Sequence, residues 1–427
     1  MKIRCRNCKK IKFKRIIKIG SQPISSIYLK KKNFKLKNYP LDLYECQSCN
    51  LIQFKKLAPL SNMYGTNYGY RTSLSPLMIN HMKKKYDHII NDPSIKKNKI
   101  LDIGSNDGTF LNFFAKKSFK KELIGIDPSA EKFKKYYNSK IKVIVDYFSK
   151  KRVEKFFNFE KQKKNFDLIT SYAMFYDIED PNSFVKDINK MLNKNGIWIS
   201  EFSYFPLLLK NLTYDQICHE HVTYYTLKTF KKIVEKNNFK IIDVNFNEIN
   251  GGSIEVFCAK KNSNKKVNRK KIEKILLDES KIDSKAYERF NTRVNNVKKV
   301  LKNFLTNLKG KKIIGYGAST KGNIVLNHCK IDKSLLPFIC DANPYKFNRY
   351  TPGTNIKIVS KRKMHSLKPK YLLVLIWSFR TEVIKQEIKF IKKGGKLIFH
   401  LPIFHIVDKS NYKYFINKDF KDFSYDY

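Results

Sequence analysis

The amino-acid sequence predicts an α/β protein in which a small cysteine-bearing domain precedes two doubly wound parallel sheets. Three observations lead to this prediction. Two C-x-x-C pairs, Cys5–Cys8 and Cys46–Cys49, lie in the first eighth of the chain. Apolar, strand-like runs alternate with amphipathic helical runs from Lys99 onward, and the alternation starts again at Lys312. Strands separated by helices are typical of parallel sheets with helices packed on both faces.

Composition limits the classes of function. A chain of 427 residues with 42% hydrophobic residues is long enough for two to four domains with buried cores. The formal net charge of +50 would suit a nucleic-acid binder. However, the positive residues are mostly lysines spread along the whole chain, whereas a dedicated binder concentrates Lys and Arg on one face or tail. We therefore expect a solvated basic surface and no nucleic-acid partner.

The sequence also predicts a compartment. The N-terminal residues Met1 to Cys5 contain no apolar run, and no stretch of the chain has the apolar length needed to span a bilayer. Four thiols kept as metal ligands need a reducing environment. We expect a soluble, cytoplasmic protein with no membrane partner, and the sequence makes no prediction of the oligomeric state.

The predicted domains follow one another along the chain. Residues 1–60 form the cysteine-bearing domain, in which short β-like runs such as Leu41–Tyr44 lead into the thiol pairs. Residues 61–262 begin with an aromatic-rich, irregular segment and a helix over 75–88, and continue as the first α/β domain. Its strands are predicted at 100–103, 123–127, 166–170 and 196–200.

Residues 263–309 are charged and helix-periodic, and we expect them to form a helical linker. Residues 310–427 then form the second α/β domain, which ends near His405 and is followed by a polar, aromatic tail. The strands of this domain are predicted at 312–317, 338–341, 371–375 and 396–399.

The two thiol pairs predict a metal site. Each C-x-x-C turn lets two sulfurs reach one tetrahedral ion, and thiolate is a ligand that zinc prefers. Two pairs fill all four positions, so we expect a structural Zn²⁺ bound by Cys5, Cys8, Cys46 and Cys49. A redox-active dithiol is the alternative for one pair alone, and a nucleic-acid-binding zinc ribbon is the alternative to a structural role.

The segment Asp102–Gly108 predicts a cofactor site, because it follows a strand and opens a helix. It lacks the G-x-G-x-x-G pattern, and an acid two residues before Gly104 suits a cationic group better than a pyrophosphate. That preference indicates S-adenosylmethionine, whose ribose Asp127 could bind at the end of the next strand. The candidate cofactor residues are Asp102, Gly104, Asn106, Asp107, Asp127, Asp146 and Tyr147.

A polar run over residues 214–225 contains the cluster His219-Glu220-His221, and the turn Asn250-Gly251-Gly252-Ser253 follows it. Two histidines around a glutamate offer a proton acceptor that titrates near neutrality and a carboxylate that could orient it, so no large pKa shift is required. A metal site is possible, but the HExxH spacing is absent. We expect a catalytic role for this cluster.

These motifs together resemble the sugar C-methyltransferases that act on nucleotide-linked deoxysugars. The resemblance extends to about residue 405 and includes the four cysteines, the D-I-G-S-N-D-G turn, the Y-D-x-I-x-H-E-H segment, the N-G-G-S turn and the run Gly315–Asn323. It implies that the central domain is a class I methyltransferase Rossmann-like domain. It also implies that the C-terminal domain is a second Rossmann-like domain, which binds the nucleotide of the substrate.

The resemblance implies a role for several residues. His221 matches the catalytic base, Glu220 its partner, and Tyr70 or Tyr68 an active-site tyrosine, while His219 could face the developing enolate oxygen. Lys321 would lie against the nucleotide. The candidate substrate-binding residues are Tyr68, Asn250, Gly251, Tyr316, Lys321 and Asn323.

The implied reaction is methyl transfer to the ring carbon beside the ketone of a 4-keto sugar nucleotide, after a base removes a proton from that carbon. One segment departs from the family pattern. Where many members carry Asn and His after the fourth strand, this chain has Tyr172–Asp177, which leaves the particular sugar open. The alternatives are O-methylation of a sugar hydroxyl and a nucleic-acid-binding zinc ribbon.

Overall fold

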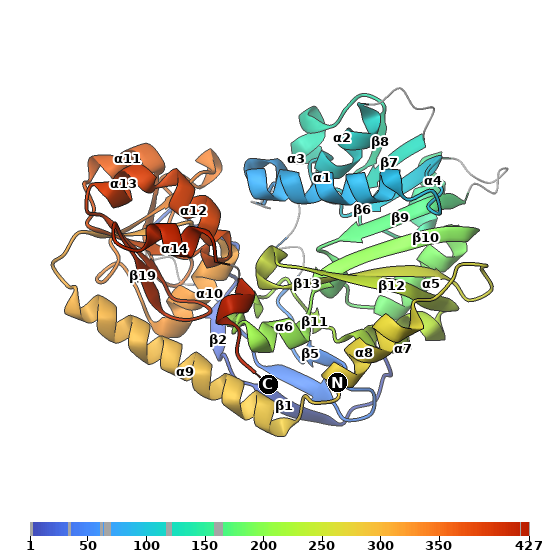
Figure 1. The fold of residues 1–427 in the computed structure, drawn as a ribbon, viewed down its shortest axis with the longest axis horizontal. Helices are drawn as coiled ribbons and strands as arrows, with labels where there is room; N and C mark the ends of the chain where they lie inside the picture. The colour runs from blue at the N-terminus through green and yellow to red at the C-terminus, as the bar shows by residue number, and fades with distance from the viewer. Residues whose placement is uncertain are drawn as a thin grey trace.

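The structure is a computed structural model that describes residues 3–32, 36–59, 63, 70–116, 122–157, 165–418 and 420–426. Figure 1 shows a central lobe and a C-terminal lobe side by side, with the N-terminal strands below them and one long helix running beneath the C-terminal lobe toward those strands. The predicted α/β fold class is confirmed. Among the described residues, no helix combines the length and apolarity needed to cross a membrane.

The N-terminal domain is built on a four-stranded sheet with the order β1-β4-β5-β11. Three of its strands come from the first 60 residues, but β11 belongs to the segment that follows His221. The predicted boundary at residue 60 therefore does not contain the whole sheet. A two-stranded sheet pairs β2 with β3. The strands are β1 (Phe13–Ile17), β2 (Ser21–Pro23), β3 (Asn38–Pro40), β4 (Leu43–Cys46), β5 (Ile52–Phe54) and β11 (Thr223–Tyr224).

The central sheet has seven strands in the order β12-β13-β10-β9-β6-β7-β8. All neighbours pair in parallel except β13, which is antiparallel to both β10 and β12. The strand order reverses beside β6, and the carboxyl end of the strand at such a reversal is where open α/β sheets usually bind ligands. The strands are β6 (Lys99–Ile103), β7 (Glu122–Ile126), β8 (Ile141–Ile144), β9 (Phe166–Tyr172), β10 (Leu192–Ser203), β12 (Phe239–Asn247) and β13 (Ser253–Lys260).

Helices cover both faces of the central sheet (Figure 1). The predicted helix over 75–88 is α1, which begins at Pro76. Ser75 caps it, because the Ser75 hydroxyl accepts from Met78 N–H. The helices are α1 (Pro76–Asn91), α2 (Thr109–Ala115), α3 (Ala130–Phe133), α4 (Lys150–Phe157), α5 (Pro181–Met191), α6 (Phe205–Lys210) and α7 (Leu227–Lys236).

The predicted helical linker consists of two helices, α8 (Arg269–Glu279) and α9 (Ser284–Asn307). Asp283 ends the break between them, because its side chain accepts from Ala286 N–H and caps α9. The buried residues of α9 recur at helical spacing, from Ala286 and Phe290 to Leu305. With this stripe α9 packs against β1, α6 and the helix α10 (Thr320–Cys329) and holds the two lobes together.

The C-terminal sheet has the order β16-β15-β14-β17-β18-β19, parallel except for β19. Its strand order reverses beside β14, which leads into the second glycine turn. The sheet continues two residues beyond His405, through β19. The elements are β14 (Ile313–Tyr316), β15 (Phe338–Asp341), β16 (Lys357–Ser360), β17 (Tyr371–Val374), β18 (Lys396–Phe399), β19 (His405–Val407), α11 (Lys361–Ser366), α12 (Arg380–Gln386), α13 (Ile388–Lys392) and α14 (Tyr412–Ile416).

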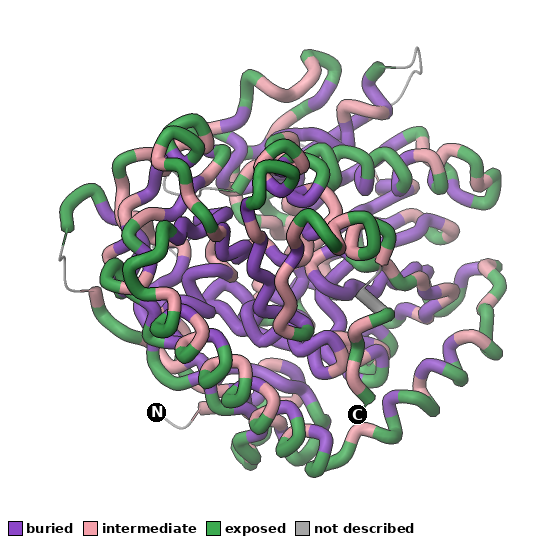
Figure 2. The backbone as a smooth tube through the Cα atoms, turned by 60° about the vertical axis from the view of Figure 1, so that its left-hand side comes forward, coloured by how far each residue is buried: buried purple, intermediate pink, exposed green. Residues whose placement is uncertain are grey.

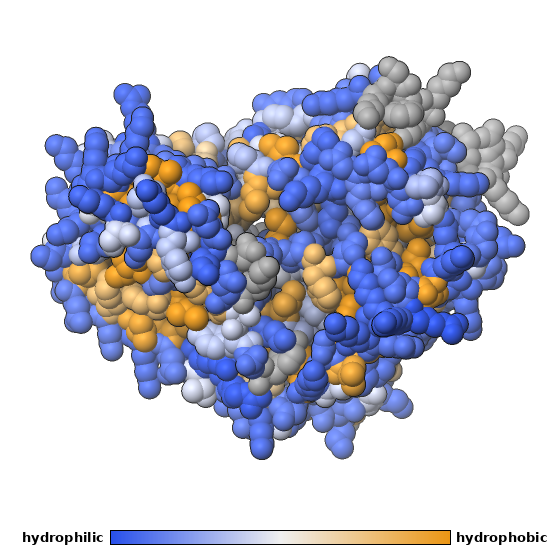
Figure 3. Space-filling view, viewed as in Figure 1, coloured by the Kyte–Doolittle hydropathy of each residue, from blue (hydrophilic) through white to orange (hydrophobic). Residues whose placement is uncertain are grey.

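The buried core runs through the strands and continues between the domains. Figure 2 shows buried backbone in the interior and exposed segments on the outer helices and loops. One hydrophobic cluster joins the N-terminal strands, α6, α9 and the C-terminal sheet, with Ile17, Phe205, Leu301 and Leu372 as members. In the view of Figure 3, hydrophilic residues make up most of the surface of both lobes, with hydrophobic areas among them. The domains therefore share a continuous hydrophobic core and are not separate units joined by a linker.

Candidate active site

The four cysteines of the two C-x-x-C pairs meet as predicted. Their sulfur atoms all lie within 4.8 Å of one another, with Cys5 Sγ 3.6 Å from Cys49 Sγ and Cys8 Sγ 3.5 Å from Cys46 Sγ. Zn–S bonds of about 2.3 Å in a tetrahedron place sulfurs about 3.8 Å apart. The set therefore fits one structural zinc ion.

The two pairs adopt the same local turn. Lys9 N–H donates to Cys5 O at 2.9 Å, and Asn50 N–H donates to Cys46 O at 2.8 Å. Lys9 and Asn50, which each follow the second cysteine of a pair, both adopt a left-handed conformation, with φ of 63° and 65°. The chain thus builds one metal-binding turn twice, which favours a shared ion over a redox dithiol.

The predicted cofactor turn lies at the carboxyl end of β6, where the strand order reverses. Gly104 has φ +75°, and a Cβ there would lie 3.0 Å from Met174 Cγ. A side chain at this position would be both strained and crowded. The turn is held from the other side by Tyr137, whose hydroxyl donates to Asn106 O at 2.8 Å. Glycine is therefore required at this point of the turn.

Two predicted acids lie beside this turn. Asp127 Oδ2 accepts from Asn106 N–H at 2.9 Å, and its Oδ1 accepts from Ser129 N–H at 2.6 Å. Asp102 accepts from the Thr170 hydroxyl at 2.7 Å, and burial raises its pKa to about 7. Two buried carboxylates at adjacent strand ends suit the cationic and hydroxyl groups of S-adenosylmethionine.

The side chains of Asn106 and Asp107 bond to the segment over residues 70–73, which the sequence did not reveal. Asn106 Oδ1 accepts from Thr72 N–H at 2.9 Å and its amide donates to Tyr70 O at 3.3 Å. Asp107 Oδ2 accepts from Ser73 N–H at 2.9 Å. Both side chains therefore fasten the segment that carries Tyr70, whose own side chain is 45% exposed.

The candidate cofactor residues Asp146 and Tyr147 follow β8. Asp146 pairs with Arg152 Nε at 2.9 Å and accepts from Tyr147 N–H at 2.7 Å. Tyr147 is 42% exposed, so its ring is available to pack against a ligand.

The cluster His219-Glu220-His221 is buried between the domains. The rings of His221 and Tyr176 have centroids 4.0 Å apart, and the edge of His219 faces Tyr39 at 6.3 Å. Burial, and then the charge of Lys321, lower the pKa of His221 to about 3. The expectation that this imidazole titrates near neutrality is therefore wrong: it remains neutral, because burial removes the solvation of the charged form and the charge of Lys321 disfavours it further.

The C-terminal domain reaches this cluster through two side chains. Lys321 Nζ donates to Asn250 Oδ1 at 2.8 Å, and Trp377 Nε1 donates to Asp215 Oδ2 at 2.8 Å. Gly251 has φ +82°, and a Cβ there would lie 2.9 Å from the Trp377 ring. The N-G-G-S turn and the segment before His219 thus form the seam at which the two lobes meet.

Two of the candidate substrate residues have protein partners elsewhere. Asn323 donates to Ser25 O at 2.7 Å and so holds the N-terminal domain. The hydroxyl of Tyr316 donates to Glu387 Oε1 at 3.0 Å, within the C-terminal domain. Tyr68 lies outside the described residues.

Sequence reasoning assigned no role to Tyr176, Asp215 or Trp377. Asp215 lies in the polar run that drew attention to His221, and Tyr176 lies in the segment that departs from the family pattern. Trp377 carried no local signal. A buried ionic cluster was also missed, in which Lys85 contacts Glu201 at 2.7 Å and Glu255 at 2.9 Å and so fastens α1 to the sheet.

Three family models match consecutive parts of the chain. A zinc binding domain matches residues 5–64, a methyltransferase domain matches residues 78–244, and a C-methyltransferase C-terminal domain matches residues 248–402. They follow one another along the chain in the order of the N-terminal, central and C-terminal domains.

Individual proteins were also found to be similar. The C-methyltransferase NovU of Streptomyces niveus is 25% identical over 406 residues, which are 93% of this chain and 95% of NovU. The ubiquinone biosynthesis O-methyltransferase of Pelagibacter ubique (strain HTCC1062) is 28% identical over 131 residues, 29% of this chain and 52% of that protein. The solved magnesium protoporphyrin IX methyltransferase from Synechocystis PCC 6803, with bound SAH, matches at a TM-score of 0.33 and 12% identity over 43% of this chain and 83% of its own.

Proposed function

We propose that this chain, which belongs to the C-methyltransferases that combine a zinc-binding N-terminal domain with a C-methyltransferase C-terminal domain, methylates a ring carbon of a nucleotide-linked 4-keto sugar. The protein is a methyltransferase, and S-adenosylmethionine and a structural zinc ion are its cofactors. The choice of carbon as acceptor is supported by NovU, which is similar over nearly the whole of both chains.

The observation that carries the proposal is that Lys321 of the C-terminal domain lies near enough to His221 for its charge to act on the imidazole. It does so at the seam between the two lobes, where Lys321 bonds Asn250 and Trp377 bonds Asp215. His221 on the central domain can act as a base, and Lys321 on the C-terminal domain is a cation. This pair suits a substrate with an acidic C–H group at one end and an anionic group at the other. A nucleotide-linked sugar has a neutral ring that can lose a proton and a diphosphate that attracts a lysine.

Neutral His221 accepts the proton from the carbon beside the ketone, which leaves an enolate. S-adenosylmethionine supplies the electrophilic methyl group. Tyr176 packs on the imidazole and fixes its plane. Glu220 Oε2 has no hydrogen-bond partner among the described residues, so it is available to a sugar hydroxyl or to the protonated imidazole. Positioning of base, sugar and methyl group supplies much of the rate.

The low pKa of His221 in the free protein makes it a weak base. Lys321 is one cause of this weakness. A diphosphate beside Lys321 would neutralise that charge and raise the pKa of His221, so the correct substrate strengthens the base that acts on it. This gives the nucleotide a part in the chemistry as well as in binding.

Product analysis tests the proposal. The purified protein is incubated with a panel of nucleotide-linked 4-keto sugars and methyl-labelled S-adenosylmethionine, and the products are examined by NMR. A methyl group on a ring carbon supports the proposal, whereas a methoxy group would establish O-methylation. In deuterated water without cofactor, the hydrogen beside the ketone should exchange. No transfer to any member of the panel would reject the substrate class.

A further inference from the structure

The segment that contains His221 continues directly into the sheet of the zinc-binding domain. Thr223 and Tyr224 form β11, which pairs antiparallel with Gln53 and Ile52 of β5. Phe54 N–H donates to Val222 O at 3.2 Å. Since β5 begins three residues after the zinc ligand Cys49, the backbone after His221 is a strand of the metal-binding domain.

The first zinc turn is bonded to the same strand. Arg6 and Asn7 are the two residues between the ligands Cys5 and Cys8. Arg6 N–H donates to Gln53 Oε1 at 2.9 Å, and Arg6 Nη1 donates to Phe54 O at 2.7 Å. Gln53 is fully buried and lies opposite Thr223. The turn therefore holds β5 at the position where β5 holds β11.

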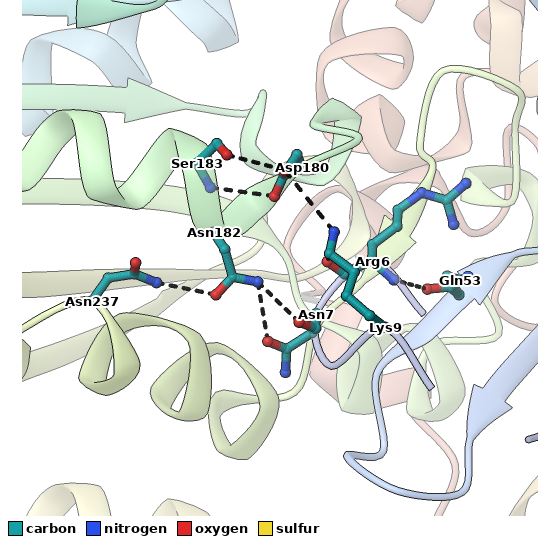
Figure 4. Close-up of polar contacts among 8 residues, drawn as sticks. All are labelled: Arg6, Asn7, Lys9, Gln53, Asp180, Asn182, Ser183 and Asn237. Carbon is teal, nitrogen blue, oxygen red and sulfur yellow. Dashed lines mark hydrogen bonds and ion pairs between the residues drawn. The ribbon is translucent and has the colours of Figure 1, made fainter. Parts of the chain in front are cut away.

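The same turn is also bonded to α5, through Asn7 and Asn182 (Figure 4). The Asn182 side-chain amide donates to Asn7 O at 3.2 Å and to Asn7 Oδ1 at 3.3 Å. This fixes the start of α5, just after the loop that carries Tyr176. Tyr176 covers the His221 ring, and its carbonyl accepts from the Thr223 hydroxyl at 3.2 Å. The loop that carries Tyr176 and the strand β11 that follows His221 are thus both bonded to the first zinc turn or to its direct partners.

We infer that Arg6 and Asn7 are positioning residues for His221, and that the zinc ion acts on methyl transfer by holding the turn that contains them. The inference rests on the proposed role of His221 as the base. Four sulfur ligands close the metal's coordination shell, so the ion takes no part in the chemistry. A turn that a metal already fixes loses little conformational entropy when it forms further hydrogen bonds. It is therefore a rigid support for a catalytic side chain.

Two variants of the full chain test the inference, each with a matched control. Asn182→Ala removes both bonds to Asn7 and the bond accepted from Asn237 Nδ2 at 3.1 Å. Asn189→Ala, on the same helix, removes a bond to Asn238 O. Arg6→Met removes the bond to Phe54, and Arg4→Met changes an exposed arginine of the same segment. For each protein we would measure zinc content, S-adenosylmethionine affinity, kcat, KM and backbone amide exchange.

We expect zinc content and cofactor affinity to stay at wild-type values in all four variants. Arg6→Met and Asn182→Ala should lower kcat about 10-fold or more, the usual cost of disturbing a support behind a site. They should also speed amide exchange in peptides covering residues 176–183 and 219–225, while the controls do neither.

Unchanged exchange and kcat would overturn the inference. So would loss of zinc from Asn182→Ala or Arg6→Met, because the turn would then serve metal retention. If His221 proves not to be the base, the exchange rates still report whether the turn orders residues 219–225, so the two hypotheses fail separately.

Discussion

In the side chain of His221, burial and the charge of Lys321 hold the pKa at about 3. The imidazole is therefore in its neutral, proton-accepting form at every pH well above about 3. If it is the base, His221→Asn should lower kcat about 10²–10⁴-fold, the typical share of general-base catalysis.

The cofactor affinity of His221→Asn, measured by calorimetry, should match the wild type, because the substitution leaves the buried acids Asp102 and Asp127 beside the glycine turn unchanged. The variant should also fail to exchange the hydrogen beside the ketone in deuterated water. Near-normal turnover would transfer the role of base to Tyr70 or His219.

Asp102 gives a second prediction at the scale of one residue. Burial raises its pKa to about 7, and the charge of Asp127 adds to this, while the Thr170 hydroxyl opposes it. A cation prefers the ionised carboxylate, so S-adenosylmethionine should bind more tightly as the pH rises from about 6 to about 8, by up to about 10-fold.

Titration calorimetry at several pH values measures this dependence on Asp102. Asp102→Asn keeps the shape and removes the titration, so its affinity should be lower and flat over the same range. An equal pH dependence in both proteins would place the titrating group elsewhere.

At the scale of elements, the metal-binding turns make a prediction about composition. Four sulfurs within 4.8 Å of one another should hold about one zinc ion per chain, measurable by elemental analysis of the purified protein. Cys46→Ser should reduce that content and lower thermal stability, since β4 ends at this ligand. The surface substitution Lys10→Ser serves as the control. A metal-free protein that is folded and fully active would contradict the assignment.

The turn over residues 249–251 makes a further prediction, because it packs against the C-terminal domain. Gly251 has φ +82°, with Thr213 and Trp377 atoms 2.6 Å and 2.9 Å from an added Cβ. Gly310 has nearly the same φ, +86°, and nothing among the described residues lies within 4 Å of an added Cβ. Gly310→Ala should therefore cost about 1 kcal/mol of stability, and Gly251→Ala about 2–4 kcal/mol.

Chemical denaturation followed by circular dichroism compares the two glycine variants. Limited proteolysis of the break between α8 and α9 shows whether Gly251→Ala also separates the lobes. Equal losses of stability in both variants would mean that Trp377 moves aside without cost.

For the whole molecule, the dominant fact is a net charge of +50, from 87 Lys and Arg against 37 Asp and Glu. The repulsion among these charges acts against the folded state, and salt screens it. The melting temperature should rise by about 2–5 °C when NaCl is raised from about 20 mM to about 300 mM. Scanning fluorimetry in chloride and in acetate at equal ionic strength separates screening from binding of one anion. A constant or falling melting temperature would contradict the prediction.

The sequence by itself determined the features that depend on neighbours in the chain. Two C-x-x-C turns, a glycine turn after a buried strand and the alternation of strands with helices follow from local geometry, because a few consecutive residues decide each of them. These features were enough to predict the zinc ligands, the α/β class and the helical linker. Within the linker, the sequence did not predict the break before Asp283, because the run is helix-periodic on both sides of it.

Only the tertiary structure decided which of these parts meet. The pairing of β11 with β5 joins residues about 170 positions apart, and the bond from Trp377 to Asp215 joins two domains. Neither leaves a pattern in the sequence, because a hydrogen bond between distant residues places no demand on their neighbours. The pKa of His221 is equally a property of the assembled molecule, since burial and Lys321 act on it only after the lobes have packed together.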